Sequence, residues 1–282
     1  MTKHCLITGA TGGLGKVLAT RFSRAGYKLA LHGRNAANVH VLAKVLSDEG
    51  GMAFPVVADL ALPDAAERLW KKVEQEFGGV DVLINNAAVH GPICPFEESD
   101  PLAWEQAFRV DFLSPAALCR KALPFMKAQK FGRIINLSGG GGTSPRPLFS
   151  AYAAAKTAMI RLGENLALES QGSGVTINSI APGAMKTALI EEVYHKGLSA
   201  GQREYALAEK IMTEGGASME NVAELCLFLA SSRADGITGK LISAKWDDYE
   251  VWPHHLEELQ NSDLYTLRRI TGRDRKTGWG DK

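Results

Sequence analysis

Apolar runs and amphipathic segments alternate along most of this chain. Short, mostly apolar runs predict seven β-strands, at Cys5–Thr8, Lys28–Leu31, Ala53–Ala58, Val80–Asn85, Gly132–Leu137, Val175–Ala181 and Gly239–Ala244. Longer segments between them have helical spacing, at Lys16–Ala25, Val39–Glu49, Asp64–Phe77, Pro101–Lys130, Ser150–Gln171 and Asn221–Ser231. This alternation is typical of βαβ units, so the sequence predicts an α/β fold with a doubly wound, Rossmann-type parallel sheet. Ligands of such sheets bind beyond the carboxyl ends of the strands.

Two segments fall outside this repeat. Residues 184–218 are polar and punctuated by glycines, which indicates a substrate-covering insertion within one dinucleotide-binding and catalytic domain, 1–244. Residues 245–282 form a C-terminal tail extension that is rich in Trp, Asp and Arg. The sequence leaves open whether this tail covers the site, reaches a neighbouring subunit or is partly disordered.

Composition narrows the range of partners. The 282 residues carry a formal net charge of +1, so neither nucleic acid nor an anionic membrane is expected as a partner. No apolar run approaches the roughly 20 residues that span a bilayer. The cysteines lack metal-ligand spacing, and we expect four free thiols, a cytoplasmic protein and no metal site: Cys5, Cys94, Cys119 and Cys226.

The first segment that indicates a ligand site is a glycine turn directly after the first predicted strand. Leu6–Gly15 reads strand, turn and helix start, the order that a dinucleotide pyrophosphate requires. Glycines let the backbone approach the phosphates, and the helix N-terminus presents free N–H groups and a positive dipole end. The predicted cofactor-binding residues of this turn are Gly9, Thr11, Gly12, Gly13, Leu14 and Gly15.

A tyrosine and a lysine lie four positions apart in a predicted helix, at Tyr152 and Lys156. This spacing places both side chains on one helix face. A phenol titrates near 10, and a neighbouring ammonium stabilises the phenolate and lowers its pKa. The pair is therefore suited to proton transfer at neutral pH.

Several motifs together resemble the short-chain dehydrogenase/reductase family, in its single-domain branch. The likeness runs from about Lys3 to Leu241. In family order, the motifs are Thr8-Gly9-x-x-x-Gly13-x-Gly15, Asp59-Leu60, Asn85-Asn86-Ala87, the strand Gly132–Leu137, Tyr152-x-x-x-Lys156 and Pro182-Gly183-x-x-x-Thr187. The glycine turn also fits the larger epimerase and dehydratase branch, but the chain length and the later motifs favour the single-domain branch.

The resemblance implies a role for each matching position. Tyr152 would exchange a proton with the substrate carbonyl or alcohol, while Lys156 would hold the nicotinamide ribose and lower the tyrosine pKa. The hydride would belong to the cofactor. The implied cofactor contacts are Asp59 and Leu60 at the adenine, Asn85, Asn86 and Ala87 beside the cofactor, and Pro182, Gly183 and Thr187 at the nicotinamide end.

The end of the second strand predicts NADP rather than NAD. NAD-preferring proteins carry an acidic residue there to bind the ribose 2′-hydroxyl, but this chain has Gly33 followed by Arg34. A guanidinium without a neighbouring carboxylate suits a 2′-phosphate. The basic residue that many NADP-dependent members carry within the glycine turn is absent, since Gly12 occupies its place.

The chain departs from the family at its orienting serine. The expected position, thirteen residues before the tyrosine, is Gly139, and Ser138 precedes it. Either the glycine run turns Ser138 inward as the catalytic and substrate-contacting hydroxyl, or a nearby hydroxyl serves, or the site lacks this group. The nearby hydroxyls are those of Thr143, Ser144 and Ser150.

Two further departures lie beside the predicted site. Asp111 replaces the family's helix asparagine, which supports the proton relay from the lysine. A carboxylate there would stabilise the Lys156 ammonium but offset its effect on the Tyr152 pKa. Ala88 replaces the glycine that usually ends the asparagine motif, which adds mild crowding near the nicotinamide.

We expect a small, polar or anionic substrate, such as a sugar, a polyol or a carboxylated ketone. Arg146, between two prolines in the loop before Tyr152, is the favoured substrate contact, and four further polar residues of the insertion are candidates, namely Lys186, Tyr194, His195 and Arg203. The predicted function is an NADP(H)-dependent oxidoreductase that interconverts a carbonyl and an alcohol. The alternatives are a weakly catalytic cofactor-binding protein and epimerase- or dehydratase-type chemistry. The resemblance implies a homodimer or homotetramer that assembles through the two long helices, whose small residues permit close packing.

Overall fold

The computed structural model describes residues 2–277 and 279. Its strands form one parallel seven-stranded sheet with the order β3-β2-β1-β4-β5-β6-β7. The chain order reverses between β1 and β4, which places the topological switch point of a doubly wound sheet there. The strands are β1 (His4–Ile7), β2 (Lys28–Gly33), β3 (Met52–Val57), β4 (Val82–Asn85), β5 (Gly132–Leu137), β6 (Val175–Ala181) and β7 (Leu241–Ser243).

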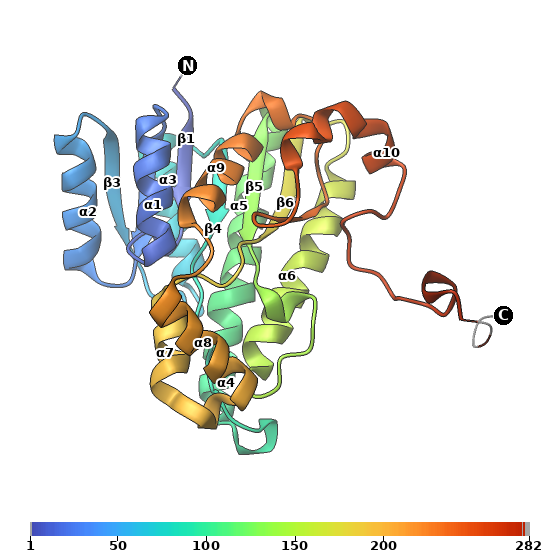
Figure 1. Ribbon diagram of the computed structural model, residues 1–282. Helices are drawn as coiled ribbons and strands as arrows, with labels where there is room; N and C mark the ends of the chain where they lie inside the picture. The colour runs from blue at the N-terminus through green and yellow to red at the C-terminus, as the bar shows by residue number, and fades with distance from the viewer. Residues whose placement is uncertain (1, 278, 280–282) are drawn as a thin grey trace.

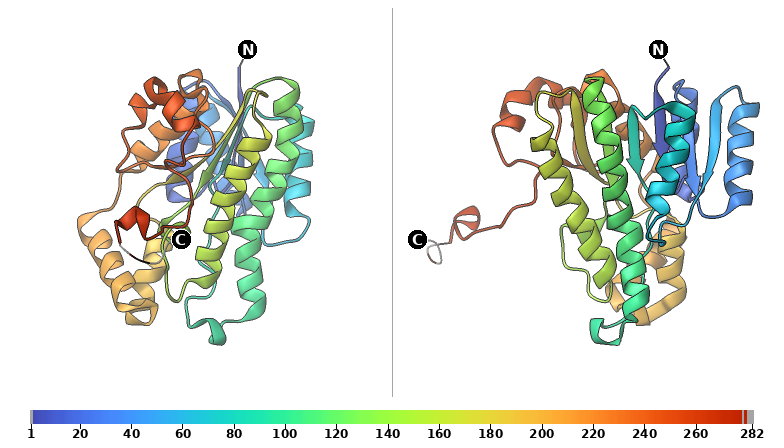
Figure 2. Two further views of the ribbon diagram at one scale, coloured as in Figure 1. Left: turned by 90° about the vertical axis from the view of Figure 1, so that its right-hand side faces the viewer. Right: turned by 180° about the vertical axis from the view of Figure 1, so that it is seen from behind.

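Helices cover both faces of the sheet, as Figures 1 and 2 show. On one face lie α1 (Gly13–Arg24), α2 (Ala36–Asp48) and α9 (Met219–Ala230), and on the other α3 (Ala65–Phe77), α5 (Ser114–Ala128) and α6 (Ser150–Glu169). Burial on both sides explains why the central strands read as continuous apolar runs without alternation. The predicted doubly wound α/β fold is confirmed.

The segment Pro101–Lys130, predicted as one helix, is interrupted in the structure. It consists of α4 (Pro101–Phe108), a π-helical turn at Arg109–Leu113 and then α5. A π-turn accommodates an extra residue in a helix and frequently accompanies a functional site. Here the π-turn carries Asp111, which is 1% exposed.

The insertion forms two helices at the carboxyl edge of the sheet, below the strands in Figure 1. They are α7 (Ala188–Lys196) and α8 (Gln202–Glu214), and we call residues 184–218 the lid. An apolar cluster joins the lid to the catalytic region, with Val193, Ala200 and Ala208 packing against Phe149 and Tyr152. These contacts place part of the lid against the side chain of Tyr152.

The tail returns to the opposite end of the molecule. It forms a 3-10 segment at Tyr249–His255 and α10 (Leu256–Gln260), which lies far from α7 and α8 in Figure 1. It then passes β7, where the Leu241 N–H donates to the Tyr265 carbonyl, and reaches α6, where the Leu267 N–H donates to Glu164. Residues 249–267 of the tail thus pack beside the sheet edge and α6, whereas the segment after them, with a 3-10 turn at Arg273–Arg275, extends away from the body of the fold (Figures 1 and 2).

Membrane-spanning helices, metal-binding groups and disulfides can be assessed for the described residues. Within them, no helix is long and apolar enough to cross a bilayer. No group of three His, Cys, Asp or Glu side chains in that part of the chain could hold a metal ion. All four cysteines are free thiols, as the spacing predicted.

Candidate active site

The glycine turn between β1 and α1 is tightly packed. Gly9 adopts a positive φ of +64°, and a Cβ there would lie 2.8 Å from the Ala87 Cα. A Cβ on Gly15 would overlap the Gly9 carbonyl. Only glycine fits these two positions, because Gly9 lies against the loop after β4 and Gly15 lies against the backbone of the turn itself.

The N-terminus of α1 is open to an anion. Its N-cap, Gly12, offers no capping side chain, and its first turn contains no acidic residue. Gly12 and Gly13 are exposed, whereas the Leu14 side chain is buried. The first N–H groups of a helix carry partial positive charge, so this end fits a pyrophosphate.

Thr8 and Asn86 brace the turn against β4. The Thr8 hydroxyl accepts hydrogen bonds from the N–H groups of Asn86 (3.0 Å) and Ala87 (3.1 Å). The Asn86 side chain donates to the carbonyls of Thr8 (2.9 Å) and Gly9 (3.1 Å). Asn86 thus holds the backbone of the turn, and its predicted contact with the cofactor stays a prediction.

His32 forms a second brace that the sequence did not reveal. Its Nδ1 accepts from the Gly9 N–H at 3.2 Å, so its Nε2–H donates to the Ala58 carbonyl at 3.1 Å. Burial lowers the pKa of His32 from 6.5 to about 4, which keeps the ring neutral. The imidazole therefore ties the glycine turn to the end of β3.

Gly33 and Arg34 lie at the end of β2. A Cβ on Gly33 would lie 2.5 Å from Val39 Cγ2 and 3.1 Å from Thr11 Oγ1, so an acidic side chain does not fit at this position. Arg34 is exposed and has no ion pair or hydrogen bond within the described residues. Nearby, the partly exposed Asp59 accepts from the Ala61 N–H at 3.1 Å, while Leu60 is buried.

The segment after β6 approaches the glycine turn from the lid side. Gly183 has a φ of +79°, and Pro182 is buried. A Cβ on Gly13 would lie 3.7 Å from Thr187 Cγ2 and 3.2 Å from the Met219 Cε. The structure thus brings together the motifs at Gly13 and Thr187, which are far apart in sequence.

Tyr152 and Lys156 lie in the first two turns of α6, and both are buried. The Lys156 Nζ donates to the Leu137 carbonyl at 3.1 Å and lies 5.5 Å from the centre of the Tyr152 ring. Burial raises the pKa of Tyr152, and Asp111 raises it further, while Lys156 and Arg146 lower it. The lysine acts in the predicted direction, but the net shift is opposite to the predicted one because burial removes water from the phenol.

Asp111 reaches the same centre from the π-turn. Its Oδ1 accepts from the Val89 N–H at 2.9 Å, and its Oδ2 lies 3.4 Å from the Lys156 Nζ. Burial raises the pKa of Asp111, against the lowering effect of Lys156. The carboxylate therefore joins the loop after β4 to the catalytic helix.

The hydroxyl of Ser138 does not meet the tyrosine hydroxyl in this structure. A Cβ on Gly139 would overlap the Tyr152 Oη, so position 139 is the one that faces the phenol. Ser138 Oγ lies on the side of Gly142, where a Cβ would come within 2.7 Å of it, and this buried oxygen has no hydrogen-bond partner. Adjacent residues of an extended segment point to opposite sides, which accounts for the difference.

Four side chains form a hydrogen-bonded chain beside Tyr152. They run from Glu192 of α7 through His90 and Arg146 to Glu204 of α8. Arg146 was predicted, but the other three were not, because they are far from it in sequence. Of the four lid residues proposed from sequence, Lys186, His195 and Arg203 are exposed, whereas Tyr194 packs against the apolar cluster that contains Tyr152 and stacks on Tyr205.

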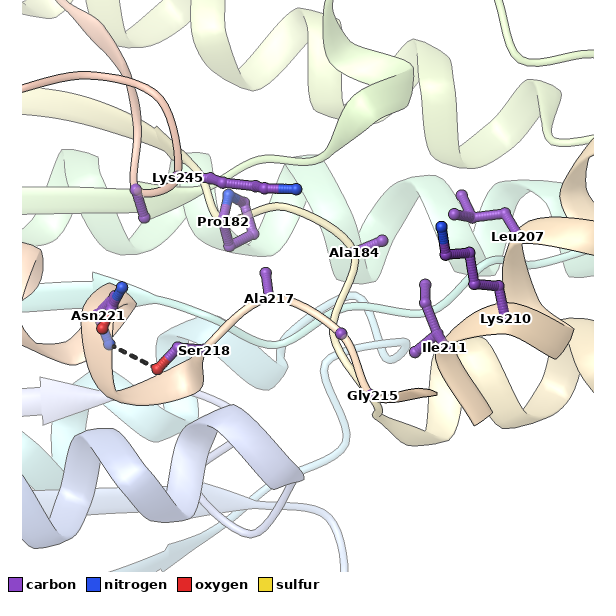
Figure 3. Close-up of a pocket in the computed structure, with 12 residues that line it drawn as sticks. Pro182, Ala184, Leu207, Lys210, Ile211, Gly215, Ala217, Ser218, Asn221 and Lys245 are labelled. Carbon is purple, nitrogen blue, oxygen red and sulfur yellow. Dashed lines mark hydrogen bonds between the residues drawn. The ribbon is translucent and has the colours of Figure 1, made fainter. Parts of the chain in front are cut away.

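A separate cavity of about 500 Å³ opens beside the lid (Figure 3). Pro182 and Ala184 border it after β6, Ile211 lines it from α8, and Lys210 and Lys245 lie toward its two ends. Neither Tyr152 nor Lys156 lines this cavity.

These features fit a dinucleotide cofactor. The turn is closely packed, the end of α1 is free of acidic groups, and Arg34 has no partner in the described chain. Together with a buried tyrosine–lysine pair beyond the ends of the strands, they define a nicotinamide-dependent oxidoreductase of the Rossmann type.

Comparison with known proteins identifies the family. The model for short chain dehydrogenase matches residues 3–197. D-beta-hydroxybutyrate dehydrogenase of Rhizobium meliloti is 34% identical over 253 residues, which cover 86% of this chain and 97% of that protein. 3beta-hydroxysteroid dehydrogenase 1 of Eggerthella lenta is 32% identical over 241 residues, covering 84% and 90%. This chain belongs to the short-chain dehydrogenase/reductase family and is an NAD(P)-dependent oxidoreductase.

A solved structure supports the same assignment. It is described as a candidate NAD(P)-dependent gluconate 5-dehydrogenase of Beutenbergia cavernae, with NADP bound at low occupancy. It matches with a TM-score of 0.77 at 29% identity, covering 89% of this chain and 96% of the other. The named substrates of these relatives differ widely, so the substrate of this chain must be inferred from its own site.

Proposed function

We propose that this protein is an NADP(H)-dependent oxidoreductase that interconverts a carbonyl and an alcohol on a small, polar substrate. The observation that carries this proposal is the buried pair of Tyr152 and Lys156, held together at the carboxyl edge of the sheet. A bound nicotinamide would supply or accept the hydride. The protein's own task is to position the substrate, exclude water and move one proton.

The proton step is assigned to the Tyr152 Oη. Because burial raises the pKa of this phenol, it stays protonated at neutral pH and is ready to donate to a developing alkoxide. Lys156 is fixed by the Leu137 carbonyl and Asp111, so its charge stays near the phenol when the proton leaves.

The residues at the end of β2 support NADP over NAD. Gly33 leaves no room for the carboxylate that would bind a ribose 2′-hydroxyl, and Arg34 presents an unpaired guanidinium within the described structure. A guanidinium can bind a phosphate with two charge-assisted hydrogen bonds. In this proposal Arg34 recognises the 2′-phosphate, and the open end of α1 holds the pyrophosphate.

The remaining cofactor contacts are proposed as the family resemblance implied. Asp59 and Leu60 would meet the adenine, Ala87 would lie beside the cofactor, and Pro182, Gly183 and Thr187 would border the nicotinamide. A homodimer or homotetramer remains the proposed assembly, and Leu113 and Leu168 on the long helices are exposed large apolar side chains that could contribute to it.

One observation favours the alternative of a weakly catalytic cofactor-binding protein. Position 139 faces the phenol but carries no hydroxyl, and Ser138 Oγ points toward Gly142. Loss of one hydrogen bond to a developing charge costs about 1.5–3 kcal/mol, a rate factor of roughly ten to a hundred. Such a loss slows an oxidoreductase without abolishing its activity.

Cofactor consumption with a panel of small carbonyl compounds tests the proposal. The purified protein should oxidise NADPH in stoichiometric amounts with alcohol formation, and faster than NADH at equal low concentrations. Binding of NADPH without turnover of any compound would support the weakly catalytic alternative. Product formation without net NADPH oxidation would support epimerase- or dehydratase-type chemistry.

A further inference from the structure

The hydrogen-bonded chain beside Tyr152 has a defined direction. The Arg146 Nη1 lies 3.4 Å from the His90 Nε2, and the His90 Nδ1 lies 3.0 Å from the Glu192 Oε2. A guanidinium can only donate, so the His90 Nε2 accepts and its Nδ1–H donates to Glu192. His90 therefore links Glu192 to one edge of the guanidinium.

The guanidinium of Arg146 lies close to the catalytic tyrosine. Its Cζ is 3.8 Å from the centre of the Phe149 ring and 5.4 Å from the centre of the Tyr152 ring. The His90 ring meets the Tyr152 ring edge to face at 5.2 Å and is 2% exposed. A substrate with its carbonyl at the Tyr152 Oη would have the rest of its body within reach of this cation.

Glu204 pairs with the Arg146 guanidinium through a single carboxylate oxygen. The Glu204 Oε2 accepts from the Arg146 Nε at 2.9 Å and lies 2.8 Å from its Nη2. The side chains of Arg146 and Glu204 are only 14% and 17% exposed. One edge of an arginine can bind both oxygens of a carboxylate with two parallel hydrogen bonds. The pair of Arg146 and Glu204 does not form this two-oxygen arrangement, because both contacts go to the same Glu204 oxygen.

The pair also connects substrate access to the lid. Glu204 belongs to α8, and residues of the lid pack in the same apolar cluster as Tyr152, so a movement of the lid would open the way to the phenol. Lid movement takes Glu204 away from Arg146 and would leave a largely buried cation unpaired. Unpaired buried charges are costly, so another carboxylate is the favoured replacement.

We propose that Arg146 binds a carboxylate of the substrate, and that Glu204 holds this place when no substrate is bound. The substrate class is then a small oxo acid, or the matching hydroxy acid, with its carboxylate a few bonds from the reacting carbon. His90 positions the guanidinium, and the exchange of Glu204 for the substrate couples anion binding to lid movement. This inference rests on the proposed function for its substrate chemistry, but binding alone tests it.

The competing explanation is a latch: Arg146 and Glu204 hold the lid closed and never touch the substrate. The two explanations differ in what removal of the Glu204 charge does. If the pair is only a latch, removal of the Glu204 charge should change the affinities for charged and neutral ligands equally. If Glu204 instead occupies the place of the substrate carboxylate, removal of its charge should tighten the binding of anions and leave the binding of neutral ligands unchanged.

Calorimetric titration of the NADP-loaded protein with butanoate and with butanamide distinguishes them. Butanoate should bind at least tenfold more tightly than butanamide. Glu204→Gln keeps an oxygen acceptor but removes the charge, and it should tighten butanoate binding tenfold or more and leave butanamide unchanged. Arg146→Lys, which keeps the charge but lacks the planar fork, should lose most of the preference for butanoate.

Glu209→Gln is the matched control, since Glu209 lies on the same helix and is exposed. In the described structure its carboxylate accepts a hydrogen bond from Tyr205, and its carbonyl accepts one from Thr213. The control substitution should leave both affinities unchanged. Equal affinities for butanoate and butanamide, or equal changes for both ligands in Glu204→Gln, would overturn the inference. Neither ligand is turned over, so a failure of the proposed reaction would appear separately, as absence of NADPH oxidation with all carbonyl compounds.

Discussion

The carboxylate of Asp111 lies 3.4 Å from the ammonium of Lys156, and both side chains are almost fully buried. This contact joins a π-turn between α4 and α5 to the catalytic helix α6. It gives Tyr152 two opposing charged neighbours at once, since Lys156 lowers the pKa of the phenol and Asp111 raises it. Rates that depend on the tyrosine proton should therefore respond to a change at either neighbour.

Asp111→Asn should move the pH profile of catalysis to lower pH. The substitution removes the charge that raises the Tyr152 pKa, so the phenol loses its proton at a lower pH than in the unmodified protein. The amide oxygen can still accept from the Val89 N–H, and we expect the rate at the optimum to stay within about tenfold. The measurement is kcat/KM for reduction and oxidation across pH 6–10, with Glu105→Gln as a surface control. An inflection that moves to higher pH would contradict the proposed relation.

Gly139→Ala should impair catalysis without affecting cofactor binding. The new Cβ would overlap the Tyr152 Oη, and the tyrosine ring is confined by His90 and the lid, so the phenol must shift from its place. We expect kcat/KM to fall at least about tenfold, equivalent to about 1.4 kcal/mol. Gly140→Ala is the control, because a Cβ at Gly140 meets nothing within 4 Å. Equal rates in the two variants would show that the phenol does not act from this position.

Arg34→Glu should reverse the cofactor preference. It replaces an exposed cation with an anion that repels a 2′-phosphate and can accept from a ribose 2′-hydroxyl. We expect the NADPH dissociation constant to rise about 10- to 100-fold, or roughly 1.5–3 kcal/mol, while that of NADH falls. Fluorescence titration of both cofactors measures this, with Arg24→Glu at the far end of α1 as the control. An unchanged ratio of the two dissociation constants would exclude Arg34 as the selecting residue.

His32 should make the protein less stable in mild acid. Its folded-state pKa of about 4 lies below the unfolded value near 6.5, so its contribution is fully present above pH 6.5 and is lost as the pH falls toward 4. Between pH 7.5 and pH 5 this amounts to about 2 kcal/mol. Urea unfolding at both pH values should show a smaller loss for His32→Gln than for the unmodified protein. The exposed His40→Gln should behave like the unmodified protein, and identical losses in all three would refute the assignment to His32.

The sequence predicted the parts of the fold and site that depend on local pattern. The apolar runs located the strands, and the four-residue spacing placed Tyr152 and Lys156 on one face of α6. The Gly33-Arg34 pair was singled out because the end of the second strand is where Rossmann proteins bind the ribose of the cofactor, and its preference for NADP stays a prediction.

Contacts between distant segments were not predictable in the same way. His90 and Glu192 are separated by 102 positions, and Arg146 and Glu204 by 58, and only the folded lid brings each pair together. The expected pKa shift of Tyr152 failed for the same reason, since burial by the lid is a tertiary property. The π-turn at Arg109–Leu113 was missed because its residues keep the periodicity of one long helix.

The account depends most directly on the Tyr152 hydroxyl as the proton donor. The decisive measurement is the rate of NADPH oxidation by Tyr152→Phe with a carbonyl compound that the unmodified protein reduces, with NADPH affinity measured on the same sample. We predict a rate about 10²- to 10⁴-fold lower and an NADPH dissociation constant within a few-fold of the original. A variant that binds NADPH normally and reduces the carbonyl at the original rate would contradict the account.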